Sequence, residues 1–158
     1  MPAHKRITGF KEFCRQTNIA NEVLLVDWSS DFSENVVKTE DTINYLDEKY
    51  PDKRKGIFLS NDNTAANFLN FLVRKHGCLP DDYRIVGFDN SSVSSEAIIP
   101  ISTVGQQIDK IAEEAMNILV MQMNEQKKCR PVPLKEPIHE IVPTVAVSRN
   151  TTNNRDIS

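Results

Sequence analysis

Short apolar runs that alternate with longer amphipathic segments limit the folds open to this chain more than any other feature. The apolar runs occupy residues 23–26, 56–59 and 84–88, and each has the length of a buried strand. The segments between them carry apolar residues at helical spacing. The order strand, helix, strand, helix, strand predicts a parallel sheet with helices on both faces. We therefore expect an α/β domain of three layers.

The same periodicity predicts the remaining elements. The expected helices are residues 6–17, 33–50, 64–76 and 108–123, with a strand at 22–28, a loop or short helix at 91–101, a last strand at 144–149 and a polar, frayed end from residue 150. Gly77 follows the third helix, where a left-handed C-terminal cap belongs. A chain of 158 residues can bury a core of its own. We expect one domain over residues 1–152 and a tail over residues 153–158.

Composition argues against several classes of function. The net charge is −3, so no global positive field attracts nucleic acid. The cysteines Cys14, Cys78 and Cys129 are odd in number and widely spaced, which argues against disulfides and zinc. The sequence has neither a signal peptide nor an apolar stretch of the roughly 20 residues that a membrane span needs. We expect a cytoplasmic protein that holds no metal and no cofactor.

Polar side chains follow each of the three expected strands. In parallel sheets, ligands bind outside the carboxyl ends of the strands. The residues found there are Asp27, Trp28 and Ser29, then Ser60, Asn61 and Asp62, and finally Asp89 and Asn90. Carboxylates, amides and hydroxyls beside an indole predict a site for a polar small molecule.

A hydroxyl-rich ligand suits this set of groups. Its hydrogen-bonding partners would be Asp89, Asn61, Asn90 and Arg6. Trp28 offers a flat surface on which a sugar ring can stack, although it could equally fill a core or an interface. Asp62 is better explained as the N-cap of the helix at 64–76, and Asn61 suits a structural or a ligand-binding role equally well.

Catalysis has little support in the sequence. The five glycines cannot build a P-loop or a GxGxxG loop, and GxSxG is absent. Asp27 and Asp89 could form an acid–base carboxylate pair, but no His or Lys follows a strand end to complete a site. We expect no enzymatic activity.

Five motifs, taken in order, resemble the LacI/GalR family of transcriptional repressors. They are RITGF at 6–10, GIFLSNDNTAA at 56–66, GCLPDDYRIVGFDN at 77–90, IIPISTVGQ at 98–106 and TVAVSRNT at 144–151. The effector domain of that family resembles periplasmic sugar-binding proteins. The resemblance therefore implies the C-terminal lobe of a type I periplasmic-binding-protein-like fold.

The resemblance also implies which residues contact an effector. They are Arg6, Trp28, Asn61, Asp89, Gln106 and Ile108. The first four would bond or stack on a sugar, and the last two would lie at the chain crossover beside the cleft. This combination of side chains favours a sugar over a purine.

The partners implied by the resemblance are an effector, a second copy of the chain and DNA. The family dimerises through this lobe, which implies interface anchors at Phe68, Phe71 and Leu72, although Phe68 and Leu72 could as well belong to the chain's own core. DNA would be read only through a helix-turn-helix or winged-helix segment expected to precede Arg6, together with most of the first lobe. A solute-binding protein of a sugar transporter is the alternative function.

The helix at 108–123 has an unusual surface. Residues 106–128 would cross back to the first lobe in the family, and the apolar side chains of the helix spread almost around its C-terminal half. Such a helix is normally buried, because each large apolar side chain left in water costs about 1.5–3 kcal/mol. We expect this helix to pack on another copy of the chain or, failing that, to fold back onto its own sheet. A helix solvated on all sides contradicts both expectations.

Overall fold

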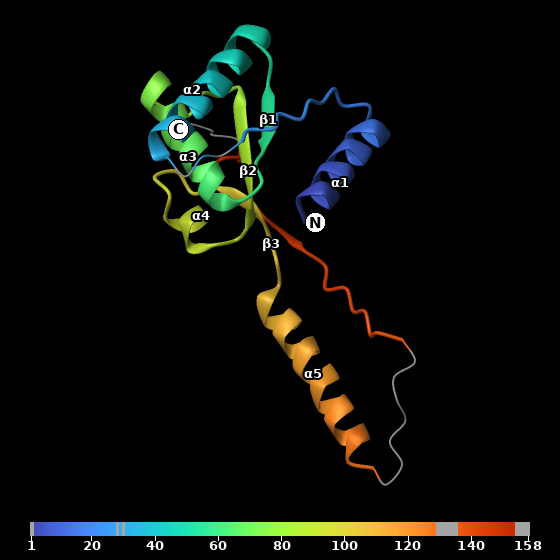
Figure 1. Ribbon diagram of the computed structural model, residues 1–158. Coiled ribbons are helices and arrows are strands. Elements are labelled where there is room, and N and C mark those ends of the chain that lie inside the picture. The colour runs from blue at the N-terminus through green and yellow to red at the C-terminus, as the bar shows by residue number, and fades with distance from the viewer. Residues whose placement is uncertain (1, 28, 30, 129–135, 154–158) are drawn as a thin grey trace.

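The computed structural model describes residues 2–27, 29, 31–128 and 136–153, and its helices and strands alternate from residue 32 onward (Figure 1). The elements are α1 (Pro2–Thr17), α2 (Phe32–Lys49), β1 (Lys55–Phe58), α3 (Asp62–His76), β2 (Tyr83–Asp89), α4 (Ser92–Glu96), β3 (Ser102–Gly105), α5 (Ile108–Gln126) and β4 (Val145–Val147). The α/β fold class is confirmed.

The strands form one sheet in the order β1-β2-β3-β4. The first three run parallel, with Ile57 opposite Ile85 and Gly87 opposite Thr103. The last strand pairs antiparallel with β3, and Gly105 lies opposite Val145. The sheet is therefore parallel except at one edge, which the sequence pattern did not predict.

Helices lie on both faces of the sheet, as predicted. On one face, the Tyr83 ring of β2 meets Phe68 of α3 with 6.5 Å between ring centroids. Phe88 points to the other face because side chains alternate along a strand, and there the guanidinium of Arg6 in α1 lies 3.8 Å from its ring centre. Phe58 stacks on Phe10 of α1 at 6.3 Å on the same side.

The hydrophobic core lies between the sheet and the helices α2 and α3. Its buried members are Ile43, Leu46, Ala65, Phe68, Leu69, Phe71, Leu72, Leu79, Tyr83, Ile85 and Ile101. The three expected interface anchors are among them: Phe68, Phe71 and Leu72 are 3%, 8% and 0% exposed. Their side chains lie in the chain's own core, the second of the two roles left open for Phe68 and Leu72. Their part in a dimer interface stays a prediction.

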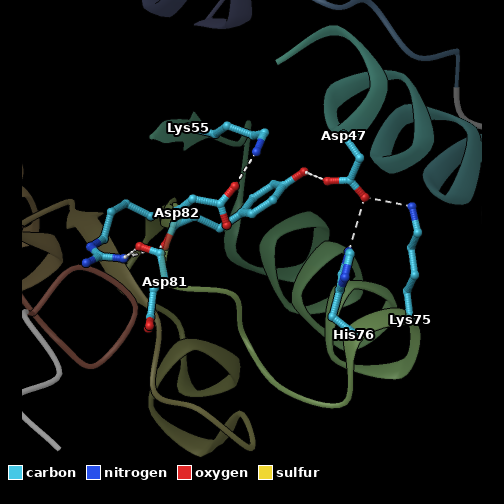
Figure 2. A network of polar contacts seen from close by, with 8 residues as sticks. Asp47, Lys55, Lys75, His76, Asp81 and Asp82 are labelled. Carbon is cyan, nitrogen blue, oxygen red and sulfur yellow. Dashed lines mark hydrogen bonds and ion pairs between the residues drawn. The ribbon is translucent and has the colours of Figure 1, made fainter. Parts of the chain in front are cut away.

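A polar network holds the amino ends of β1 and β2 (Figure 2). Asp47 of α2 accepts hydrogen bonds from Tyr83 Oη at 2.6 Å and Lys75 Nζ at 2.7 Å. Lys55 is buried, and it is paired with Asp82 while lying 4.6 Å from the centre of the Tyr83 ring. A buried charge of this kind is tolerated because it is paired, so this edge of the sheet has a structural role.

The α5 helix extends away from the sheet (Figure 1). None of its residues is buried, and Ile108, Met116 and Met121 are each more than half exposed. The expected return of this helix onto the sheet is therefore wrong for the residues that the structure describes. Packing of α5 on another copy of the chain stays a prediction.

The expected strand at 22–28 is wrong in the part that the structure describes, since no strand is found between β1 and the end of α1. Contacts with α2 hold this segment instead. Glu22 accepts a hydrogen bond from Tyr45 Oη at 2.7 Å, and the Asp27 carbonyl accepts one from Lys38 Nζ at 2.6 Å. Leu25 is 83% exposed as a result.

The expected fraying from residue 150 is also wrong at its start. Thr151 is buried, and its hydroxyl donates to the Ile85 carbonyl at 2.6 Å while accepting from the Ser102 amide at 2.9 Å. These bonds anchor the chain beside β2 and β3 after β4 has ended. Strand β3 itself was missed as a strand, because two of its four residues are hydroxyl side chains that periodicity does not recognise as buried.

Candidate functional site

The carboxyl ends of β1 and β2 bring the expected polar residues to one edge of the sheet. Because the two strands are parallel, Asn61 after β1 and Asp89 at the end of β2 lie at the same edge. Gln106 follows β3, which is parallel to β2, and therefore joins them. The predicted clustering holds for Asn61 and Asp89, and Gln106 lies beside them.

Arg6 reaches this edge from α1. Its guanidinium donates to the Ser60 carbonyl, next to Asn61 in sequence, and lies over the ring of Phe88, next to Asp89. A guanidinium has five N–H donors, so these two contacts leave donors for a ligand. Phe88 was not singled out in the sequence, since an aromatic residue within a strand carries no distinctive pattern. Ser60 was named there for its polar side chain, whereas its contact with Arg6 uses the backbone carbonyl.

Asn61 serves as the N-cap of α3. Its Oδ1 accepts from the Thr64 amide at 2.8 Å and from Thr64 Oγ1 at 2.9 Å. The cap fixes the side chain at the helix start with its oxygen occupied. The two roles left open for Asn61 are therefore compatible, because only its amide nitrogen is needed as a donor toward a ligand.

Asp62 is not the N-cap that the sequence suggested. Its side chain is buried and accepts from Thr103 Oγ1 at 2.6 Å and the Ser91 amide at 2.7 Å. The carboxylate approaches β2 where Gly87 has no side chain, and a Cβ at that position would overlap Asp62 Oδ1. The signal for this role was the glycine inside an apolar strand.

Asp89 ends β2 in a backbone conformation that side chains rarely adopt, with φ 107°. Its Oδ1 accepts a hydrogen bond from Gln106 Nε2 at 2.9 Å. Asn90 follows with φ 56°, and its Oδ1 accepts from Arg149 Nη2 at 2.8 Å. Two consecutive residues in this region indicate stored strain, which tends to occur at functional sites.

The two remaining expected contacts are placed differently. Trp28 lies outside the described residues, so its stacking role stays a prediction. Ile108 is the first residue of α5 and is 60% exposed. It follows Gln106 by two residues, which keeps it beside the edge.

Two hollows in the described part of the chain lie away from this edge. One, of about 290 Å³, lies between α2 and α3 and includes Phe71 and Lys75 in its lining. The other, of about 160 Å³, lies between α5 and residues 140–143. Neither is lined by the expected effector contacts, so the case for the sheet edge depends on its side chains and not on a cavity.

Metal and membrane chemistry find no support in the described residues. No group of three or more His, Cys, Asp or Glu side chains is placed to hold a metal ion. Among the same residues, no helix is both long enough and apolar enough to cross a membrane.

Comparison with known protein families gives the arrangement its context. A model of the periplasmic binding protein-like domain matches residues 2–151. The chain belongs to this family. In open α/β sheets, ligands bind outside the carboxyl ends of the strands, which is the edge where Asn61 and Asp89 lie.

Relatives of this periplasmic binding protein-like chain are transcriptional repressors. It is 31% identical over 157 residues to the ribose operon repressor of Halalkalibacterium halodurans, and 27% identical over 154 residues to the ribose operon repressor of Bacillus subtilis. The alignments cover 99% and 98% of this chain but 43% of each relative. The chain therefore spans less than half the length of these curated relatives.

Solved structures agree on the fold. A LacI family transcriptional regulator from Enterococcus faecium with bound ribose superposes with a TM-score of 0.68 at 21% identity, over 94% of this chain and 51% of that one. The resemblance to the LacI/GalR family that the five motifs carried is confirmed.

Proposed function

We propose that this chain is the effector-sensing part of a LacI/GalR-type repressor and that its effector is a sugar. The observation that carries the proposal is the joining of Arg6, Asn61, Asp89 and Gln106 at one edge of the sheet. Together they offer a carboxylate acceptor, amide groups and a guanidinium, which match the paired donors and acceptors of neighbouring sugar hydroxyls. Trp28 would add the stacking surface.

A pentose is the first sugar to test. Two relatives are named ribose operon repressors, and a structural neighbour has bound ribose. These names belong to the other proteins, and they support D-ribose here as a probe. They also favour a regulatory role in the cytoplasm over catalysis or transport.

Sensing would act through a change of population between two states. In the intact protein the effector would sit between this lobe and a second one, and a sugar that binds the closed state better shifts the equilibrium toward closure. A homodimer formed through the outer face of α3 and residues 91–99 would pass this change to the DNA-binding part of the intact protein.

Titration of the ¹⁵N-labelled chain with D-ribose tests the site. We expect concentration-dependent shifts of the Asn61, Asp89 and Gln106 amide signals, in the millimolar range because one lobe buries only part of a ligand. Asp89→Asn should remove most of this response. The control variant Asp81→Asn changes an exposed carboxylate at the other end of β2 and should respond as the wild type does.

A purine base provides the ligand control. It should leave the same signals unmoved if the edge is built for sugar hydroxyls. A wild-type chain whose signals do not move at roughly 100 mM D-ribose or other common sugars, far above the millimolar range, would overturn the proposed function.

A further inference from the structure

The carboxyl edge of the sheet, where Asn61, Asp89 and Gln106 lie, is called the effector edge below. Two consecutive residues at this edge need an external restraint. Asp89 and Asn90 both have positive φ, at 107° and 56°. Such conformations are unfavourable for residues other than glycine and persist only where the surroundings hold them. The direction of the Asp89 carboxylate therefore depends on whatever fixes this turn.

The side-chain restraint on Asn90 comes from Arg149, 59 residues further along the chain. Arg149 Nη2 donates to Asn90 Oδ1 at 2.8 Å. The other end of the fork, Nη1, donates to the Ile101 carbonyl at 2.9 Å and to Ser94 Oγ at 3.2 Å. One guanidinium thus ties the turn to the start of β3 and to α4.

Arg149 is itself well fixed. Its amide donates to Ser102 Oγ at 2.8 Å, and its carbonyl accepts from the same hydroxyl at 3.1 Å. Because backbone and side chain are both held, the fork has little freedom to follow a moving turn. A planar, rigid fork transmits position better than a flexible lysine does.

Residues 106–149 leave the sheet toward α5 and return through β4, and this segment is called the excursion. The residues at its two ends each donate a hydrogen bond to one residue of the turn. Gln106, where the chain leaves the sheet toward α5, donates to Asp89. Arg149, where the chain has returned through β4, donates to Asn90. The geometry of the effector edge therefore depends on how the excursion enters and leaves the sheet.

We propose that Arg149 is a positioning residue for effector binding, which fixes the Asp89–Asn90 turn through Asn90 and so sets the direction of the Asp89 carboxylate. The proposal rests on the proposed function for its ligand. Arg149 itself contacts the turn, and its effect on the effector passes through Asn90.

Two variants separate positioning from general stability. Arg149→Gln removes the fork, and Asn90→Gly removes only the acceptor of the fork, since glycine adopts a φ of 56° without strain. The matched control is Arg84→Gln at the opposite end of β2, where Arg84 Nη1 donates to the Asp81 and Tyr83 carbonyls. Arg149→Lys keeps the charge without the fork.

The rate of amide hydrogen exchange measures how firmly the Asp89–Asn90 turn is held, and it needs no sugar. The reporters are Asn90, whose amide donates to Thr103 Oγ1, and Ser91, whose amide donates to Asp62. In Arg149→Gln and Asn90→Gly, exchange at both reporters should rise about tenfold, while the amides of Leu59 and Gly77 stay within about twofold. Arg149→Lys should lie between the wild type and Arg149→Gln, and Arg84→Gln should match the wild type.

The D-ribose titration then reads the consequence. Both variants should need about fivefold more D-ribose for the same shift at Asp89, which is the net contribution of one ordinary hydrogen bond. The double variant should be no weaker than Arg149→Gln alone, because both changes break one contact. An additive double variant, or an Arg149→Gln chain that matches the wild type in both readouts, would overturn the proposal.

Two other results remain decisive. If Arg149→Gln accelerates exchange at Leu59 and Gly77 as well, that variant is globally destabilised. The Asn90→Gly variant then decides, since unchanged exchange at the Asn90 and Ser91 amides in it refutes the positioning role. If the wild type does not respond to any sugar, the proposed function fails, and the exchange data still decide whether Arg149 fixes the turn.

Discussion

Gly87 illustrates at the residue scale why one missing side chain matters to the effector edge. A Cβ there would overlap Asp62 Oδ1 and would lie 3.3 Å from Asp62 Cα and 3.4 Å from Ala65 Cβ. The buried carboxylate cannot retreat, because it is bonded to Ser91 and Thr103. The glycine therefore permits the close approach of α3 to β2.

Substituting Gly87→Ala should destabilise the domain by about 2–3 kcal/mol, since overpacking next to backbone forces a shift. Chemical denaturation followed by circular dichroism measures the loss. The control is Gly56→Ala in β1, where a Cβ meets no atom within 4 Å. Equal stability of the two variants would contradict the close-approach explanation.

Asp47 offers a second prediction, which concerns pH. Burial opposes its charged form, but hydrogen bonds from Lys75 and Tyr83 outweigh burial and lower its pKa below the ordinary 3.8. A lowered folded-state pKa adds stability that is complete above the unfolded-state value and is lost as pH falls through the folded-state value.

Asp47→Asn should therefore lower the free energy of unfolding by about 1–2 kcal/mol at pH 7, and the difference from the wild type should shrink as pH falls below about 4. Urea denaturation at several pH values measures this. Asp41→Asn, an exposed residue of the same helix, is the control. A difference that stays constant down to pH 3 would show that the carboxylate charge is irrelevant.

At the scale of elements, the periodicity of apolar residues predicted those helices and strands that are determined by local sequence and burial. The helices α2 and α3, the strands β1 and β2 and the Gly77 cap with φ 78° all follow from apolar spacing and cap chemistry. The expected strand at 22–28 is absent because an apolar run forms a strand only where a neighbouring strand is available to pair with it. Here the segment is held by α2 instead, since Glu22 is hydrogen-bonded to Tyr45 and Lys49.

The candidate site was predictable only where its residues depend on local sequence and strand direction. The rule for parallel strand ends located Asn61 and Asp89 correctly, because it depends only on strand direction. The parts supplied by distant contacts, such as Arg149 on Asn90 and Asp62 on Thr103, leave no periodic trace in the sequence.

The α5 helix carries the prediction at this scale. Leu119, Val120 and Met123 are each 48% exposed, and burying them between two copies would offset the cost of leaving them in water. We expect sedimentation velocity to show association that grows with concentration. The variant Leu119→Lys with Met123→Lys should weaken it without lowering the melting temperature of the sheet domain. Purely monomeric wild-type chain at high concentration would contradict this.

For the whole molecule, the placement of the proposed effector contacts limits the affinity that we expect. Arg6, Asn61, Asp89 and Gln106 all lie at one edge of one sheet, and Arg6 reaches it from α1, whereas tight small-molecule sites enclose most of their ligand. Isothermal titration calorimetry should therefore find D-ribose binding much weaker than micromolar. A micromolar dissociation constant, about 8 kcal/mol of binding free energy, would show that the described edge is a complete site.

The antiparallel pairing of β3 with β4 makes the excursion through α5 removable. Gly105 and Val145 are direct partners in the ladder, so a two-residue hairpin turn can join the strands. The cost of closing a loop grows by about 0.6 kcal/mol per doubling of its length, so replacing roughly forty residues with two would recover about 2–3 kcal/mol. A miniature domain that joins Gly105 to Val145 through Asn-Gly should consequently fold faster than the parent chain and resist denaturant at least as well. A foreign peptide or domain could be inserted at the same position, between Gly105 and Val145.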